Sequence, residues 1–240
     1  MLNFRFVIYA LMLVAAIFVP IGKASAALIT GSSGGTFSAV SSCGGDNCRL
    51  NNTSNGNNTQ LEWGYTNGFF GIGAEPGSTL TAVDRSWNQL SNANDVILAE
   101  LVWFNRATPN NVTADSFNVR YSLGINFTSP NASSDTELFN LQIDNTTNST
   151  GDYIHGLTLS DLGNLSFSLN GIVISDLKYA LSGGGTFNSN TWYNPENNTS
   201  RMFITADFTD RASAVPEPGS LILLAAGFLS LSVLRRRRKV

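Results

Sequence analysis

Six apolar residues alternate strictly with polar or small residues between positions 117 and 127. A period of two places every second side chain on the same face of an extended chain, so this segment predicts a half-buried antiparallel β-strand. The segment from Asp95 to Asn105 is apolar on both faces, which predicts a central strand covered on both sides. The alternating residues are Phe117, Val119, Tyr121, Leu123, Ile125 and Phe127.

Further short strands are predicted between Ala27 and Ala214, separated by clusters of Gly, Asn, Ser and Pro. No stretch of this body has a sustained helical period, and no fixed repeat favours a β-helix. Many short strands separated by turn residues predict an all-β body that forms a β-sandwich, jelly-roll-like in type. The additional predicted strands are 36–42, 60–65, 79–83, 137–144, 157–162, 165–170, 172–179 and 201–209.

The N-terminus has the pattern of a secretory signal peptide. A basic residue precedes an apolar run over 6–19, and Ala24 and Ala26 form a small-x-small cleavage site. We therefore predict a signal peptide over 1–26 that signal peptidase removes after Ala26, which makes the body an exported domain. A retained membrane anchor is the alternative, and the helix-breaking Pro20 disfavours it.

The C-terminus combines three elements in a fixed order. Pro216, Glu217 and Pro218 precede an uncharged apolar segment over 219–234 and a basic tail over 235–239. As a helix, the apolar segment would be roughly 24 Å long, which predicts a single short transmembrane helix whose arginines reach the membrane surface. The basic tail should stay cytoplasmic and place the body across the membrane, in agreement with the signal peptide.

This order of elements over 215–240 resembles the PEP-CTERM sorting signal, whose tail is the substrate of exosortases, which are membrane-embedded cysteine proteases. The resemblance implies that Pro216, Glu217 and Pro218 form the recognition motif and that an exosortase-like protease removes the tail near it. It also implies a cell-surface or extracellular-matrix protein of a Gram-negative bacterium with an exopolysaccharide-rich envelope or biofilm. A plain C-terminal anchor after two prolines is the alternative.

Four landmarks occur in order along the body: Trp63-Gly64, 78–80, 98–105 and 139–148. Their order resembles the choice-of-anchor K domain, a β-rich extracellular module that is attached to alternative surface anchors. Ala99 departs from that pattern, which has glycine before the glutamate. The resemblance implies a place at the cell surface and no particular chemistry.

The body is acidic, with 7 Lys and Arg against 16 Asp and Glu between residues 27 and 214. An acidic surface repels phosphate, and no basic stripe is present in the sequence, so nucleic acid is excluded as an expected partner. The predicted partners are signal peptidase, an exosortase-like protease and the membrane. An extracellular polysaccharide is a further candidate partner.

The two cysteines, Cys43 and Cys48, are separated by four residues. In an exported protein this pair predicts a disulfide that pins the Asn-rich loop after it. A redox pair normally has two intervening residues, and a metal site would need further ligands that the chain's single histidine hardly supplies.

His155 is the only histidine, so a Ser–His–Asp hydrolase would have to use it, with Asp152 or Asp161 to orient its ring. The sequence contains no Gly-x-Ser-x-Gly motif, which favours a structural role for His155.

Glu100 lies within an apolar run, where desolvation would raise its pKa and suit it to act as a general acid. The alternative is that Glu100 pairs with Arg106, Arg120 or a backbone amide, or lies where the face opens to solvent. A glycosidase needs a second carboxylate, and spacing alone nominates none. We therefore name no catalytic residue and expect that the chain is not an enzyme.

Exposed aromatic rings could stack on sugars, and the candidates are Trp63, Trp192 and Tyr193. Trp192 and Tyr193 lie between Asn-rich turns, so we expect an exposed pair. No cofactor or metal is predicted. Calcium is the alternative considered, because aspartates near turns supply the oxygen ligands that it prefers. These aspartates are Asp46, Asp84, Asp144 and Asp152.

The sequence thus favours an exported, exosortase-processed surface or matrix protein with a non-catalytic structural or adhesive role. A lectin-like carbohydrate-binding module is the second hypothesis. A polysaccharide-active enzyme that uses Glu100 is the third.

Overall fold

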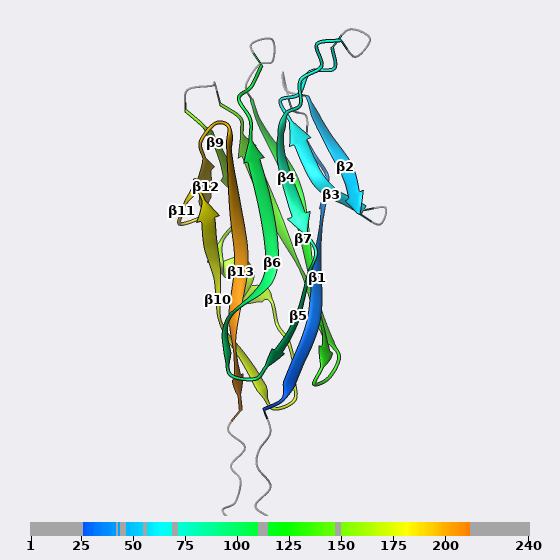
Figure 1. The fold of residues 1–240 in the computed structure, drawn as a ribbon, viewed down its shortest axis with the longest axis vertical. Coiled ribbons are helices and arrows are strands. Elements are labelled where there is room, and N and C mark those ends of the chain that lie inside the picture. Colours follow the sequence, from blue (N-terminus) through cyan, green and yellow to red (C-terminus); the bar gives the residue numbers. More distant parts are fainter. Residues whose placement is uncertain are drawn as a thin grey trace, which may run out of the picture.

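The computed structural model describes residues 26–41, 43, 47–54, 57–68, 72–109, 115–146 and 150–211. In these residues, two antiparallel sheets pack face to face as an elongated β-sandwich (Figure 1). The all-β sandwich prediction is therefore confirmed.

The larger sheet has seven strands in the order β11-β12-β9-β8-β7-β1-β5. Its strands, in chain order, are β1 (Leu28–Ser38), β5 (Arg85–Leu90), β7 (Ser116–Ser129), β8 (Ser133–Asp144), β9 (Asp152–His155), β11 (Thr186–Asn188) and β12 (Thr191–Asn194).

The smaller sheet has six strands in the order β10-β13-β6-β4-β3-β2. Its strands, in chain order, are β2 (Cys48–Ser54), β3 (Asn57–Trp63), β4 (Ser78–Val83), β6 (Ala93–Asn105), β10 (Ile172–Gly183) and β13 (Asn198–Asp210).

The two strands that the sequence predicts best are present. In β7, every second side chain from Phe117 to Phe127 is buried, and those between are exposed or partly exposed. β6 lies between β4 and β13, so it is a central strand, as predicted, but it is not covered on both sides: Ile97 is exposed and Val102 and Phe104 are partly exposed on its outer face.

The strands predicted over 157–162 and 165–170 are wrong. The first region contains a short helix, α2 (Leu159–Asn164), and residues 165–169 are irregular. Thr158 caps this helix, because its side-chain oxygen accepts a hydrogen bond from the Asp161 N–H at 3.2 Å. Within α2 only Leu162 is buried, so this single turn reaches the core through one side chain and does not have the alternating buried face of a strand.

Aromatic rings from both sheets meet in the core. The Trp103 ring on β6 lies 5.2 Å from that of Trp192 on β12 and 6.3 Å from that of Trp63 on β3. Farther along the sandwich, Phe127 on β7 packs against Phe208 on β13, with centroids 5.9 Å apart. Large rings thus fill the space between the sheets along much of its length.

The first and last described residues lie at the same end of the sandwich (Figure 1). Ala27 exchanges two hydrogen bonds with Ser91, and Asp210 exchanges two with Asn92. The turn between β5 and β6 therefore fastens both ends of the body. We call this end the anchor pole and the opposite end, where β6 and β1 finish, the distal pole. The 13 residues of β6 span about 43 Å between the poles.

Strand alternation corrects the prediction that Trp192 and Tyr193 form an exposed pair. Neighbouring residues of a strand point to opposite faces, so only one of the two can face solvent. Trp192 is completely buried, and its Nε1–H donates to Ser200 Oγ at 3.0 Å, whereas Tyr193 stays partly exposed.

This difference predicts opposite costs for two neighbouring substitutions. We expect Trp192→Ala to lower the free energy of unfolding by about 3–5 kcal/mol, because it leaves a cavity between the sheets. Tyr193→Ala should cost no more than about 1 kcal/mol. Urea unfolding of both variants measures this difference, and equal costs would contradict the observed side-chain directions.

Candidate functional site

Two tyrosines form an aromatic pair on the outer face of the seven-stranded sheet. Tyr153 on β9 stands directly opposite Tyr193 on β12, with ring centroids 5.2 Å apart and planes inclined by 42°. Both rings are partly exposed, whereas their strand neighbours Ile154 and Trp192 are completely buried. The buried neighbours fix the strands, so the tyrosine rings are held toward solvent.

A groove of about 460 Å³ lies beside this pair. Apart from the tyrosines, its lining carries only hydroxyl and amide side chains. Such donors and acceptors match the hydroxyl groups of a sugar, and an aromatic ring covers its apolar face. We call this site the tyrosine groove. It is lined by Tyr153, Tyr193, Thr186, Asn188, Ser189, Asn190 and Thr191.

His155 joins the groove to a row of polar side chains across the sheet. One ring nitrogen lies 2.9 Å from Thr191 Oγ1 and the other 2.9 Å from Asp144 Oδ2. The orienting carboxylate is therefore Asp144, and not Asp152 or Asp161 as considered from the sequence. The row is thus suited to binding and to orientation of side chains.

Trp63, the third sugar-stacking candidate, belongs to the core. It is completely buried, and its ring packs against Trp103 and Phe117. Its Nε1–H donates to Asp152 Oδ2 at 3.4 Å. Like Trp192, Trp63 has no face with which to stack on a ligand, so Tyr193 alone of the three candidates remains accessible.

Two buried carboxyl groups lie at the distal pole. Burial raises the pKa of Asp152 to about 7; the hydrogen bond from the Thr146 N–H opposes this shift, and the charge of Glu196 adds to it. Burial also raises the pKa of Glu196, whose carboxylate oxygens accept no hydrogen bond from the described residues. Near neutral pH, this region of the fold is therefore sensitive to proton release.

Glu100, the candidate general acid, is enclosed by two arginines. Its carboxylate is completely buried; Oε1 lies 2.6 Å from Arg201 Nη1, and Oε2 pairs with Arg85. Glu100 is therefore held in an ion pair, as the alternative had it, but its partners are Arg85 and Arg201 and not Arg106 or Arg120. With both oxygens in ion pairs, Glu100 is not directed at an open site.

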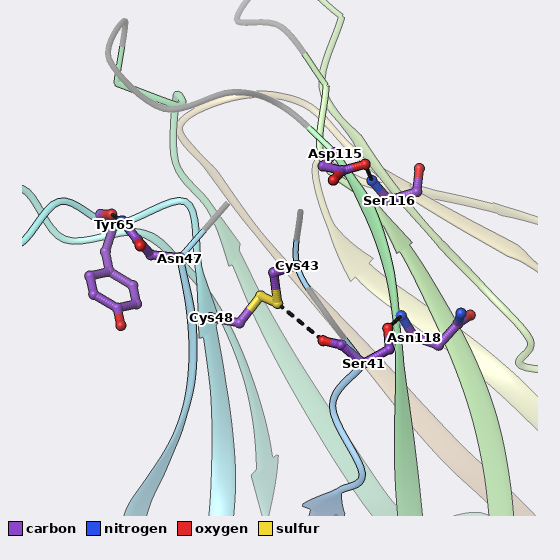
Figure 2. Close-up of a disulfide and its surroundings, with 8 residues drawn as sticks. All are labelled: Ser41, Cys43, Asn47, Cys48, Tyr65, Asp115, Ser116 and Asn118. Atoms are coloured by element: carbon purple, nitrogen blue, oxygen red, sulfur yellow. Dashed lines mark hydrogen bonds between the residues drawn. A yellow bond between two sulfur atoms is a disulfide. The ribbon is translucent and has the colours of Figure 1, made fainter. Parts of the chain in front are cut away.

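The Cys43–Cys48 disulfide lies where the chain passes from one sheet to the other (Figure 2). On one side, Ser41 exchanges two hydrogen bonds of 2.8 Å with Asn118 on β7. On the other side, Asn47 Nδ2 donates to the Tyr65 carbonyl oxygen at 2.6 Å. The disulfide thus closes a crossing between the two sheets at the distal pole, and the Asn-rich segment that begins at Cys48 is the strand β2 rather than the predicted loop.

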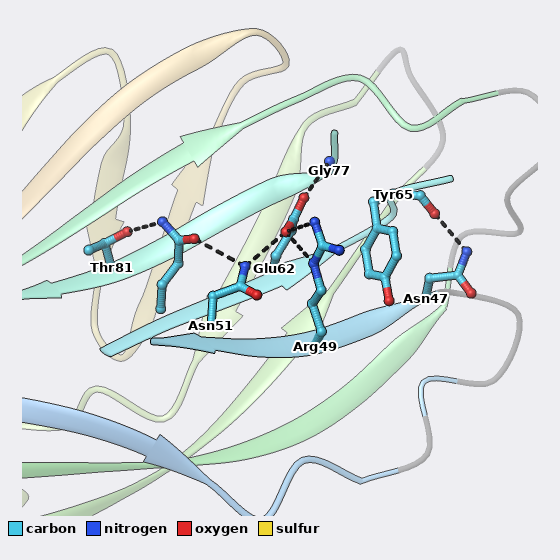
Figure 3. A network of polar contacts seen from close by, with 8 residues as sticks. Asn47, Arg49, Asn51, Glu62, Tyr65, Gly77 and Thr81 are labelled. Atoms are coloured by element: carbon cyan, nitrogen blue, oxygen red, sulfur yellow. Dashed lines mark hydrogen bonds and ion pairs between the residues drawn. The ribbon is translucent and has the colours of Figure 1, made fainter. Parts of the chain in front are cut away.

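A polar network runs across β2, β3 and β4 on the outer face of the six-stranded sheet (Figure 3). Glu62 pairs with Arg49 at 2.7 Å and accepts from Asn51 Nδ2 and the Gly77 N–H. Burial alone would raise the pKa of Glu62, but these donors lower it below the usual range. The Arg49 guanidinium also lies 4.3 Å from the centre of the Tyr65 ring. Every charged group in the network has a partner, which indicates a structural role.

The aspartates that suggested calcium do not gather in the described structure. Asp46 lies outside the described residues, Asp152 is buried beside Trp63, and Asp144 pairs with His155. A different group, Asp95, Asp176 and Asp207, brings oxygens within 4.8 Å of one another. Lys178 Nζ lies 2.8 Å from an Asp95 oxygen and 2.6 Å from an Asp176 oxygen. Its ammonium group therefore already forms ion pairs with two of the three aspartates. Calcium binding stays a prediction.

The predicted targeting residues fall almost entirely outside the described structure. These are Ala24, the Pro216, Glu217 and Pro218 motif, the transmembrane segment 219–234 and the basic tail 235–239. Within the described part of the chain, no helix has the length and apolar character that a membrane crossing requires.

Comparison with known protein families matches residues 214–239 to the PEP-CTERM protein-sorting motif. This match implies an exported protein that exosortase sorts and that associates with the membrane through its C-terminus. No similar curated protein was found for the chain. The resemblance of the body to the choice-of-anchor K domain has no support from these comparisons.

Sequence reasoning missed Tyr153 as a partner of Tyr193. The two residues are 40 positions apart and meet only because β9 and β12 pair in this register. The alternation of Tyr153 with buried Ile154 was the local signal that could have indicated an outward ring.

The raised pKa of Asp152 predicts a stability that falls as pH rises. Between its ordinary value of 3.8 and about 7, the unfolded chain loses the proton that the folded chain keeps. The free energy of unfolding should therefore fall by up to about 4 kcal/mol over this range, because each pKa unit corresponds to about 1.4 kcal/mol. We expect Asp152→Asn to reduce this slope and to raise stability at pH 7.

Asp144→Asn provides a control of opposite sign. Although burial acts to raise the pKa of Asp144, hydrogen bonds from Gln142, Ser116 and His155 lower it overall. Its contribution to stability is therefore present at neutral pH and lost as pH falls, so Asp144→Asn should destabilise at pH 7. Urea unfolding at several pH values measures both variants. An unchanged slope in Asp152→Asn would contradict the assignment.

Proposed function

We propose that the chain is an exported surface protein whose body has a non-catalytic structural or adhesive role. The main support is the position of the ends: Ala27 and Asp210 are both fastened to the turn at Ser91 and Asn92. A body held by its C-terminal segment would then stand on its anchor pole. The distal pole, about 43 Å away, would face the surroundings.

After export, an exosortase-like protease would remove the tail near Pro216, Glu217 and Pro218. The body would remain in the envelope or the extracellular matrix of a Gram-negative bacterium that forms exopolysaccharide or biofilm. The PEP-CTERM match supports sorting by this route, and a choice-of-anchor K body would suit such a surface position.

The surroundings of the two catalytic candidates favour a role without catalysis. Glu100 is held by Arg85 and Arg201, and His155 is part of a row of hydrogen-bonded side chains. A structural or adhesive role needs only a stable body and accessible outer faces.

Replacement of the central residue of the sorting motif tests the proposed processing. We expect Glu217→Ala to accumulate in the membrane fraction with its C-terminal tail, because the protease would no longer recognise the motif. Glu75→Ala is the matched control, since Glu75 is exposed and far from the motif in sequence. Mass spectrometry of the recovered chains gives the answer; an identical C-terminus in Glu217→Ala and the unmodified chain would contradict the proposal.

A second candidate function is saccharide binding in the tyrosine groove. The partly exposed Tyr153–Tyr193 pair and the hydroxyl and amide lining favour a neutral sugar, because no ionised side chain lines the groove. The sequence suggested three sugar-stacking residues, Trp63, Trp192 and Tyr193. Of these, Tyr193 lines the groove.

Substitution of Tyr193 tests this second function. Once a glycan array identifies a bound glycan, we expect Tyr193→Ala to weaken binding by about tenfold or more, which corresponds to about 1.4 kcal/mol. Tyr193→Phe keeps the ring and should retain most of the affinity. A bound glycan whose affinity is the same in Tyr193→Ala, or the binding of no glycan at all, would contradict a role for the groove.

A further inference from the structure

The outer face of the six-stranded sheet carries a patch of partly exposed apolar side chains. Strand alternation turns Leu101 and Met202 into the core and leaves Val102 and Phe203 on the opposite face. Ile97 on this face is 38% exposed. The patch is continuous across strands, because Glu100 stands opposite both Phe203 and Val83, and Val102 is opposite Arg201. It comprises Val83, Ile97, Val102, Phe104 and Phe203.

The distal half of this face is positive. Arg85 and Arg201 surround Glu100, and Arg49 pairs with Glu62. The Arg106 guanidinium lies over the Phe104 ring, 5.2 Å from its centre. Four arginines against two glutamates leave an excess of positive charge, although the body as a whole is acidic. We call these four arginines the arginine half.

The half nearer the anchor pole is negative. Asp95, Asp176 and Asp207 lie around Lys178, so three carboxylates face one ammonium group. We call these three aspartates the aspartate half. Along β13, Arg201 and Asp207 are six residues apart, which is about 20 Å. One face therefore carries arginines interspersed with apolar side chains in its distal half and aspartates in the half nearer the anchor pole.

We propose that this face binds a second copy of the same chain in an antiparallel arrangement. A two-fold axis that lies in the interface plane, at right angles to the strands and between the two charged halves, places the arginine half of each copy over the aspartate half of its partner. The opposite, parallel arrangement would place arginine on arginine and aspartate on aspartate, which is repulsive. The charge pattern therefore selects the antiparallel pair, and the apolar patch supplies the area that both copies bury.

This arrangement has a consequence for adhesion, which rests on the proposed function. In an antiparallel pair, the anchor poles of the two copies lie at opposite ends of the dimer. Two copies attached to one surface at their anchor poles cannot both keep that orientation in such a pair. Pairing therefore joins copies on two opposing surfaces, and this assigns the chain a self-recognising adhesive role.

Clustering of lipid vesicles that carry the full chain tests this pairing. We expect vesicles with the unmodified chain to cluster and their hydrodynamic radius to grow severalfold. In 1 M salt, where the screening length is about 3 Å, clustering should weaken strongly. If the vesicles stay separate at low salt and the detergent-solubilised chain sediments as a monomer at all concentrations, the proposal is wrong.

Two charge variants make the test specific. The first combines Asp95→Asn, Asp176→Asn and Thr209→Lys and makes the aspartate half positive. Asn replaces the two aspartates because both have a positive φ of 52°, a backbone conformation that Asn tolerates. The second combines Arg106→Glu and Thr199→Glu and makes the arginine half negative without breaking the ion pairs of Glu100 or Glu62. Vesicles with either variant alone should stay separate, because like charges then meet. A mixture of the two kinds of vesicle should cluster.

Restored clustering in the mixture also shows that both variants are folded. If both variants unfold at the temperature of the unmodified chain and their mixture stays separate, antiparallel pairing is contradicted. If unmodified vesicles cluster only after an acidic polysaccharide such as alginate is added, the face binds an anionic polymer and not a second copy. Because the vesicles receive the chain directly, a failure to cluster leaves the proposed export and processing untouched.

Discussion

The fold depends on the packing of aromatic rings between two sheets. Trp63 and Trp103 from the smaller sheet meet Trp192 and Phe117 from the larger one, with ring centroids 5.2 to 6.3 Å apart. Rings of this size bury large apolar areas and hold the sheets in one relative position. Since side chains alternate along each strand, every ring fixed in the core also fixes the direction of its outward neighbours.

This constraint produces the two outer faces on which the proposals rest. On the larger sheet, buried Trp192 and Ile154 hold Tyr193 and Tyr153 toward solvent. On the smaller sheet, the inward residues of β6 and β13 leave the apolar patch and its two charged halves on the outside. The anchor pole gives these faces an orientation, because both ends of the body leave the sandwich beside the turn at Ser91.

Local patterns made part of this structure predictable from the sequence. The alternation in β7 was decisive, because a period of two in one segment needs no knowledge of its neighbours. The environment of Glu100 was not predictable, because its arginines lie 15 and 101 residues away and meet it only in the folded sheet. The tyrosine groove likewise requires the register of β9 with β12. The exposed Trp192–Tyr193 pair was an avoidable error, since adjacent residues of one strand cannot share a face.

Delivery of the body to the cell surface is tested most directly by the intact mass of the chain recovered from its native envelope. We predict a mass for Ala27 to about Val215, with any attached sugar as heterogeneous additions. This result would establish removal of both terminal segments around the body. A mass that extends from Ala27 through Val240 would contradict processing at the Pro-Glu-Pro motif and would leave a simple tail-anchored protein.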